Sequence, residues 1–222
     1  DPKLAVPDGV EAADAREIVD TDAPLQYRGA YAGNFSLHSD LFRYALILKH
    51  GGWYSDIDVL MLRKEVPRSA IFAAWEDRRK VNGAILAAPA GEPFIAAALA
   101  KAREIGETPE WGIAGPDVVT SVLAAHGRLN EAHPPVAAYP IHYSECYKLF
   151  LPETRDEVAD RCEAAYFLHL WNEMIRRSGI PKTAAPPRGS WLDERFRDLD
   201  VRFPGTDRLT APDIRKAFAL VD

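Results

Sequence analysis

The chain has 222 residues, 47% of them hydrophobic, with a formal net charge of −6, which is ordinary for a soluble globular protein. The negative charge argues against nucleic acid as the main partner. The overall charge does not attract an anionic ligand either, so a bound cation or local basic residues must attract it. No transmembrane helix is predicted, because the most apolar stretch, Val81–Ala102, is broken by Pro89, Gly91, Glu92 and Pro93. The two cysteines are too few for a disulfide framework or a Cys-based zinc site. We expect reduced thiols, with a single disulfide as the alternative.

Helices and strands are predicted to alternate along the chain. A weak helix or turn at 10–19 and a loop at 20–36 come first. A helix capped by Ser39 then runs to the turn at Gly51, and a strand follows at 53–62. The other expected elements are strands at 71–75, 83–88, 141–143 and 165–171, helices at 93–105, 116–127, 191–199 and 212–220, and a proline-rich loop at 181–189. This alternation predicts an α/β sheet with helices on both faces, in a single domain over residues 1–222.

Two carboxylates one residue apart, Asp56 and Asp58, follow the Gly-Gly turn. Such a pair can bind a hard divalent cation that is shared with phosphate oxygens. If the strand continues through the pair, its period of two places Tyr54 and both carboxylates on one face. That is the carboxyl end of a strand, where ligands bind in such sheets. A bare D-x-D also occurs by chance, so the pair alone does not identify a metal site.

Asp40 and Arg43 are three residues apart on the preceding helix and therefore share a face. They could bind the chemical group that is attached to a phosphate held by the cation. The alternative is that Asp40 is only a favourable charge at a helix N-terminus, with Arg43 as its surface ion-pair partner. His169 follows an apolar run, and it is either a structural histidine or a further metal ligand. Trp171 is expected in the core or in a pocket wall, with a platform for the acceptor as the alternative.

The order of these features closely resembles the DXD-type sugar transferases. This family includes bacterial capsule and lipopolysaccharide glycosyltransferases, yeast initiating mannosyltransferases and the glucosylating domains of large clostridial toxins. The match is nearly complete at Ser39, Asp40, Arg43, Tyr44, Gly51, Gly52, Tyr54, Asp56 and Asp58. Weaker similarities follow at Val81–Ile85, Gly115–Thr120 and His169–Asn172, so the resemblance spans residues 1–195.

The resemblance implies a GT-A fold, with a Rossmann-type sheet that binds a nucleotide sugar. It implies a UDP- or GDP-sugar donor, Mn²⁺ (or Mg²⁺) as the cofactor, and transfer of a hexose to a glycan or glycolipid acceptor with retention of configuration. It also implies that Asp58 binds the cation, that Asp56 holds the cation through water or contacts the sugar or ribose of the donor, and that His169 is a further ligand. Asp40 would accept hydrogen bonds from sugar hydroxyls, and Arg43 would donate to sugar or phosphate. The remaining expected donor contacts are Tyr54 and Asn82.

The chain begins at Asp1, and 38 residues precede Ser39, where family members usually have a further strand and helix. It stays open whether an N-terminal segment is missing, and the residues that bind base and ribose are not identified. A Golgi enzyme of this type would normally carry a membrane anchor, so we expect a cytoplasmic bacterial protein of polysaccharide biosynthesis. The basic run Arg78–Lys80 is a solvated face, or it attracts an anionic acceptor or the inner membrane surface.

Two other classes of protein remain to be tested. Asp56-Ile57-Asp58-Val59 also fits the D-x-D-x-V motif of haloacid-dehalogenase-type phosphatases, although their motif needs an apolar run leading into the first aspartate. The second alternative is a non-catalytic nucleotide-sugar-binding protein that keeps the fold. Turnover of a donor distinguishes this second class from an active transferase.

Overall fold

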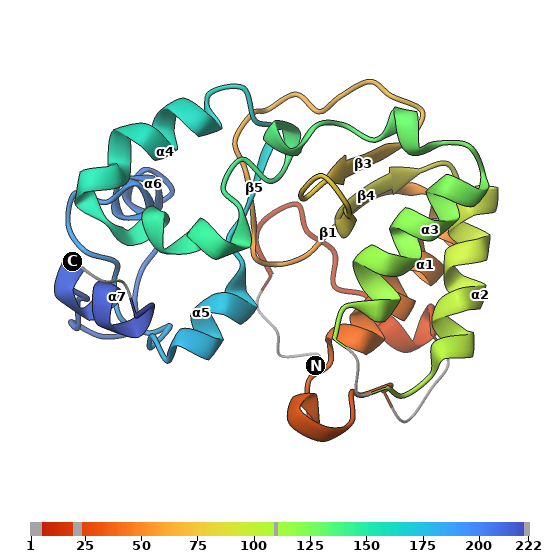
Figure 1. The fold of residues 1–222 in the computed structure, drawn as a ribbon, viewed down its shortest axis with the longest axis horizontal. Helices are drawn as coiled ribbons and strands as arrows, with labels where there is room; N and C mark the ends of the chain where they lie inside the picture. Colours follow the sequence, from red (N-terminus) through yellow and green to blue (C-terminus); the bar gives the residue numbers. More distant parts are fainter. Residues whose placement is uncertain (1–5, 20–23, 109–110, 220–222) are drawn as a thin grey trace. The chain divides into compact units, whose positions relative to one another are not determined.

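The computed structural model describes residues 6–19, 24–108 and 111–219, and Figure 1 shows its mixture of helices and short strands. The chain divides into two compact units. We call them the N-terminal unit (Asp1–Tyr54, Ala70–Ala73 and Val81–Glu131) and the C-terminal unit (Ser55–Ser69, Ala74–Lys80 and Ala132–Asp222). The predicted α/β composition is confirmed, whereas the GT-A architecture stays a prediction.

The N-terminal unit is built around strand β4 (Val81–Ala88), in a sheet of strand order β1-β4-β3 with β1 at Gly52–Ser55 and β3 at Phe72–Trp75. Helices α1 (Ser36–His50) and α3 (Val118–Ala125) both pack on β4, and α2 (Pro93–Ile105) packs on both of these helices (Figure 1). All eight residues of β4 are buried. Because successive side chains of a strand point to opposite faces, both faces of β4 are covered.

The C-terminal unit contains an antiparallel pair of short strands, β2 (Val59–Met61) and β5 (Phe167–His169). Their register places Val59 opposite His169. The helices of this unit are α4 (Arg155–Cys162), α5 (Asn172–Ser178), α6 (Trp191–Asp198) and α7 (Ala211–Ala217). Its hydrophobic core includes Leu168 of β5, with Leu60 of β2 packed against it.

Short helical turns connect these elements. They are Ala15–Glu17, Gly29–Tyr31, Ile113–Asp117, Leu129–Glu131, Pro135–Ala137, Tyr143–Phe150 and Pro152–Thr154. Among the described residues, no helix combines the length and the hydropathy that a membrane crossing requires.

Most predicted elements are found within a few residues of their expected bounds, because periodic apolar spacing marks the helices and short apolar runs mark the buried strands. The apolar spacing of α2, for example, buries one face of that helix, and Pro93 occupies its first turn. The weak helix at 10–19, the strands at 71–75 and 83–88, the helices at 191–199 and 212–220 and the loop at 181–189 are confirmed. Positions 20–23 of the expected loop and position 220 of the last helix lie outside the described residues. Helices α4 and α5 were not predicted.

The helix before the motif starts earlier than predicted. It begins at Ser36, whose backbone N–H donates to the side chain of Asn34 (2.8 Å). Ser39 is therefore not the N-cap, and its hydroxyl donates to the carbonyl of Phe35, the residue before the helix. Asp40 consequently lies in the second turn, where a helix dipole contributes little.

The strand predicted through the D-x-D pair is interrupted. β1 ends at Ser55 and β2 begins at Val59, while residues 56–58 leave the extended conformation. The chain turns here because β1 and β2 belong to different sheets. Ile57, expected on the apolar face of a strand, is fully exposed instead.

Three further predictions were wrong in detail. Residues 141–143 form no strand, and the 3₁₀ segment Tyr143–Phe150 follows them instead. Pro116 does not open the next helix but lies in the turn Ile113–Asp117, which is kinked at Gly115. Strand β5 ends at His169, two residues early, because Trp171 has a left-handed backbone conformation (φ 56°).

Both cysteines, Cys146 and Cys162, are free and buried, so the alternative of a disulfide is wrong. Burial raises the pKa of Cys146 to about 12 and that of Cys162 to about 11, because the thiolate is disfavoured away from water. Both therefore stay protonated at neutral pH.

We expect neither thiol of the native protein to react readily with a disulfide reagent at about pH 8. The attacking species is the thiolate, so reaction should be on the order of a hundredfold slower than for an exposed cysteine. Absorbance of the released thiolate measures this, and unfolding the protein should make both thiols reactive. Rapid modification of either thiol in the native protein would contradict its burial.

Candidate functional site

The C-terminal unit brings Asp56, Asp58 and His169 together. One ligand atom from each of them lies within 4.8 Å of the other two. The Nε2 atom of His169 is 3.5 Å from Oδ1 of Asp58, and the His169 side chain is only 10% exposed. We call this group the carboxylate–histidine cluster. It joins the predicted aspartate pair to the histidine that the sequence left ambiguous.

Strand pairing explains how this cluster forms. The register of β2 with β5 places His169 beside the chain segment that leaves Asp58. Just beyond the paired strands, the backbone N–H of Leu170 donates to the Asp58 carbonyl (2.8 Å). The backbone N–H of Asn172 donates to Oδ2 of Asp58 (2.9 Å). Main chain and side chain of Asp58 are thus both held by the segment that carries His169.

The cluster has the donor set of a divalent-cation site and nearly its size. Two atoms that each lie about 2.2 Å from one ion are at most about 4.4 Å apart, so ligand atoms that lie within 4.8 Å of one another need only a small shift to share one ion. Carboxylate oxygens suit Mg²⁺, Ca²⁺ and Mn²⁺, whereas imidazole suits transition metals. A set of two carboxylates and one imidazole therefore suits a transition metal better than Mg²⁺.

The N-terminal unit holds the other predicted pair. Nη1 of Arg43 donates to Oδ1 of Asp40 (2.6 Å), and their side chains are only 6% and 8% exposed. The guanidinium carbon also lies 5.1 Å from the ring centre of Tyr54, within the range of a cation–π interaction. The alternative of a surface ion pair is therefore wrong. We call Asp40 and Arg43 the buried ion pair.

Two glycines make room for the buried ion pair, a feature that the sequence did not reveal. A Cβ atom at Gly83 would lie 2.9 Å from Nη1 of Arg43. A Cβ atom at Gly115 would lie 3.0 Å from Oδ1 of Asp40. Neither glycine has positive φ, but at both positions a Cβ atom would crowd a side chain of the buried ion pair. Both belong to segments that had only weak similarity to the family.

Asn82 is also buried in the N-terminal unit. Its Oδ1 accepts a hydrogen bond from the backbone N–H of Ala84 (2.7 Å), which fixes the orientation of the amide. The N-terminal unit thus contains Asp40, Arg43, Tyr54 and Asn82. The C-terminal unit contains Asp56, Asp58 and His169.

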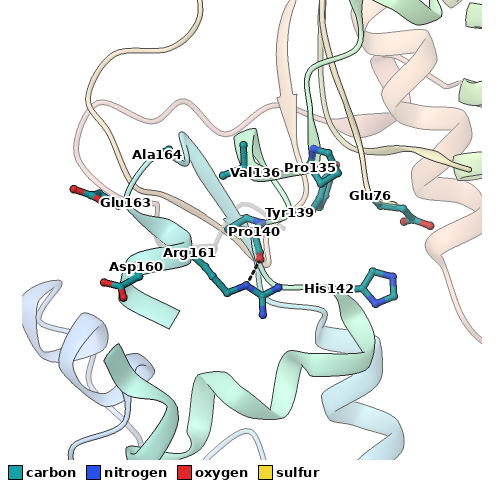
Figure 2. Close-up of a pocket in the computed structure, with 10 residues that line it drawn as sticks. All are labelled: Glu76, Pro135, Val136, Tyr139, Pro140, His142, Asp160, Arg161, Glu163 and Ala164. Atoms are coloured by element: carbon teal, nitrogen blue, oxygen red, sulfur yellow. Dashed lines mark hydrogen bonds between the residues drawn. The ribbon is translucent and has the colours of Figure 1, made fainter. Parts of the chain in front are cut away.

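A separate cavity of about 400 Å³ lies within the C-terminal unit. Figure 2 shows its lining residues, which are Glu76, Pro135, Val136, Tyr139, Pro140, His142, Asp160, Arg161, Glu163 and Ala164. Arg161 donates to the carbonyl of Pro140 (3.0 Å) and forms ion pairs with Glu145 and Glu157. Because its charge is compensated, the lining is acidic in balance. None of the predicted site residues lines this cavity.

The comparisons with known proteins agree with the motif. Residues 6–75 match the family model described as "Glycosyltransferase sugar-binding region containing DXD motif". Residues 87–185 match the one described as "Alpha 1,4-glycosyltransferase conserved region". The first match contains the buried ion pair and the aspartate pair, and the second contains His169. No solved structure is significantly similar to the chain.

Three relatives illustrate the similarity. The chain is 28% identical over 157 residues to lactosylceramide 4-alpha-galactosyltransferase of Rattus norvegicus, covering 66% of this chain and 43% of the relative. It is 30% identical over 154 residues to alpha-1,4-N-acetylglucosaminyltransferase of Homo sapiens, covering 62% and 43%. It is 30% identical over 157 residues to lactosylceramide 4-alpha-galactosyltransferase of Pongo pygmaeus, covering 66% and 72%.

The chain therefore belongs to the family of DXD-motif glycosyltransferases, and the resemblance inferred from its sequence is confirmed. It spans about 43% of the length of the rat and human relatives. These relatives come from mammals, so the bacterial origin, the cytoplasmic location and a role in polysaccharide biosynthesis stay predictions. Family membership gives no support to the phosphatase alternative.

Removing one charge of the buried ion pair should destabilise the protein more than removing both. Asp40→Asn leaves the Arg43 guanidinium buried without its counter-charge, which we expect to lower the free energy of unfolding by about 3–5 kcal/mol. Asp40→Asn combined with Arg43→Gln should recover at least about half of that loss. Chemical denaturation of the single and double variants measures both values.

The control is Asp198→Asn in α6, where Arg195 and Asp198 form an exposed ion pair at the same spacing. Exposed pairs contribute little, so its unfolding midpoint should hardly change. Equal losses in the single and double Asp40 variants would show that charge burial is not what makes the pair sensitive.

Proposed function

We propose that this chain is a metal-dependent glycosyltransferase that moves a hexose from a nucleoside-diphosphate sugar to a glycan or glycolipid acceptor. The observation that carries the proposal is the carboxylate–histidine cluster, whose three ligand atoms lie within 4.8 Å of one another in a chain of the DXD family. The proposal includes a GT-A fold for residues 1–222 as one catalytic domain.

We further propose that the product has an α-1,4 linkage. The relatives are named for 4-alpha-galactosyl and alpha-1,4-N-acetylglucosaminyl transfer, and the second family match is described by the same linkage. A lactose-containing glycolipid is accordingly the first acceptor to try. Retention of anomeric configuration is what the family resemblance implies.

The cluster supplies the metal chemistry in this proposal. Asp56, Asp58 and His169 would hold Mn²⁺. The bound ion would act as a Lewis acid that neutralises charge on the departing diphosphate. Asp58 is the best prepared ligand, because the Asn172 N–H holds Oδ2 and Oδ1 lies near His169. That hydrogen bond limits side-chain rotation before any ligand binds, which reduces the entropy lost on binding.

The buried ion pair supplies hydrogen-bonding groups. Asp40 would accept from sugar hydroxyls, and Arg43 would donate to the sugar or to a phosphate oxygen. Tyr54 lies against the Arg43 guanidinium and would donate to phosphate, while Asn82 would contact the sugar. Because Asp40 and Arg43 already neutralise each other, they can bind a neutral hexose without adding net charge. The acceptor hydroxyl would attack from the front face, and the leaving phosphate would take its proton.

The alternative of a non-catalytic nucleotide-sugar-binding protein is tested by turnover. A thermal-shift panel of UDP- and GDP-sugars with and without Mn²⁺ should identify the donor, since a ligand at a hundredfold excess over Kd stabilises the native state by about 2.7 kcal/mol. Release of nucleoside diphosphate from that donor then separates a transferase from a sensor. Binding without turnover, with or without acceptor, would favour the sensor.

Donor binding should depend on metal through Asp58. Without a cation the cluster's carboxylates and the donor diphosphate repel each other, so Asp58→Ala should weaken Mn²⁺-dependent UDP or GDP binding by roughly a hundredfold. His169→Ala should weaken Mn²⁺ binding by at least about tenfold. Titration calorimetry with and without EDTA measures these affinities.

Asp160→Ala is the matched control, since it removes an exposed carboxylate of the same unit outside the cluster, and it should leave Mn²⁺ binding unchanged. Equal nucleotide affinity in EDTA and in Mn²⁺ would show that Asp58 does not act through a cation.

The buried ion pair should affect the sugar more than the nucleotide. The double variant Asp40→Asn/Arg43→Gln, whose stability is partly restored, should lose at least about a hundredfold in transfer and donor hydrolysis. Its affinity for free UDP or GDP should change less than about threefold. Steady-state kinetics and calorimetry compare the two readouts, and a large loss of nucleotide affinity would instead assign the pair to the nucleotide site.

A further inference from the structure

Trp171 has a backbone conformation that is unusual for a bulky side chain. Its φ and ψ are 56° and 47°, in the left-handed region. For an L-residue this region brings Cβ close to the following carbonyl oxygen, and such a residue persists only where the surrounding structure enforces it. Contacts of Trp171 must therefore offset the backbone strain at this position between β5 and α5.

The indole side chain supplies the enforcement. It is 7% exposed, and its Nε1–H donates to the carbonyl of Ile141 (2.7 Å). The ring lies edge-on to His169, with centroids 4.2 Å apart, and close to Tyr139 and Tyr143. The hydrogen bond to Ile141 and the three neighbouring rings hold Trp171 in its left-handed backbone conformation.

The strained turn redirects one backbone N–H. In the register of β2 with β5, a strand continued beyond Leu170 would place Asn172 opposite Asp56, as the next hydrogen-bonded pair of the ladder. Instead, the turn at Trp171 sends the Asn172 N–H to Oδ2 of Asp58 (2.9 Å). The ladder bond from Leu170 to the Asp58 carbonyl (2.8 Å) is kept.

We infer that Trp171 is a positioning residue for the carboxylate–histidine cluster. Its left-handed backbone delivers the Asn172 N–H to one oxygen of Asp58, so that the other oxygen faces His169. Its ring packs on the His169 imidazole and limits the rotation of that ligand. The inference rests on the proposed function in that it assigns the prepared ligands to a divalent cation, for which Mn²⁺ is the probe.

Two substitutions separate the backbone from the ring. Trp171→Gly and Trp171→Ala remove the same ring, but only glycine adopts positive φ without strain. We expect Trp171→Ala to weaken Mn²⁺ binding at least about tenfold and Trp171→Gly to weaken it about threefold. Hydrogen exchange of the Asn172 amide should stay protected in the wild type and in Trp171→Gly, and should become at least about tenfold faster in Trp171→Ala.

A second pair covers the case in which Trp171→Ala does not fold. Trp171→Phe keeps an aromatic ring but loses the hydrogen bond to Ile141, so it should lower both Mn²⁺ affinity and Asn172 protection. Trp191→Phe makes the same change at a buried tryptophan in the core of the same unit, and it should alter neither.

Equal behaviour of Trp171→Gly and Trp171→Ala, or of the two phenylalanine variants, would overturn the inference. So would an unprotected Asn172 amide in the wild type. If the wild type binds no Mn²⁺, the proposed metal site fails, and the exchange rates still decide whether Trp171 holds Asn172 on Asp58.

Discussion

The antiparallel pairing of β2 with β5 is the interaction on which the carboxylate–histidine cluster depends. Each strand is only three residues long, yet the pairing brings Asp58 to Asn172, 114 positions further along the chain. Leu168 belongs to the hydrophobic core of the C-terminal unit, and Leu60 packs against that core. Burial of these side chains holds the register, since a slip of one residue would turn them to the opposite face.

The buried ion pair and the carboxylate–histidine cluster differ in how their charges are compensated. The Asp40 carboxylate is neutralised inside the protein by the Arg43 guanidinium at 2.6 Å, so its burial requires no metal ion. The cluster collects two carboxylates beside an imidazole, and Asp58 remains 21% exposed. The proposed function uses this difference, because it assigns a neutral sugar to the first group and an ion to the second.

Close backbone approach or a strained backbone conformation accompanies each group. Gly83 and Gly115 let the buried ion pair approach the backbone, and Trp171 bends the chain beside Asp58. Gly51, at φ 67°, ends α1 where a Cβ atom would lie 2.6 Å from the nitrogen of Ala90. Strain and close approach are thus found next to the side chains that the proposed function uses.

The sequence by itself determined the features that depend on neighbours within a few residues. Helix α2 follows from its apolar spacing and strand β4 from its continuous apolar run, and the ordered polar residues from Asp40 to Asp58 identify the family. Spacing also placed Asp40 and Arg43 on one helix face, because three residues nearly complete a helical turn. It could not show that the pair is buried.

Tertiary structure decided what depends on distant partners. The strand at Asp56 is interrupted because β1 and β2 join different sheets, and no local preference records which strand pairs with which. His169 becomes a neighbour of Asp58 through the register of β5, and Trp171 turns left-handed under contacts that include the carbonyl of Ile141. Propensity reports the energy of a segment alone, whereas these features arise from contacts between segments far apart in the chain.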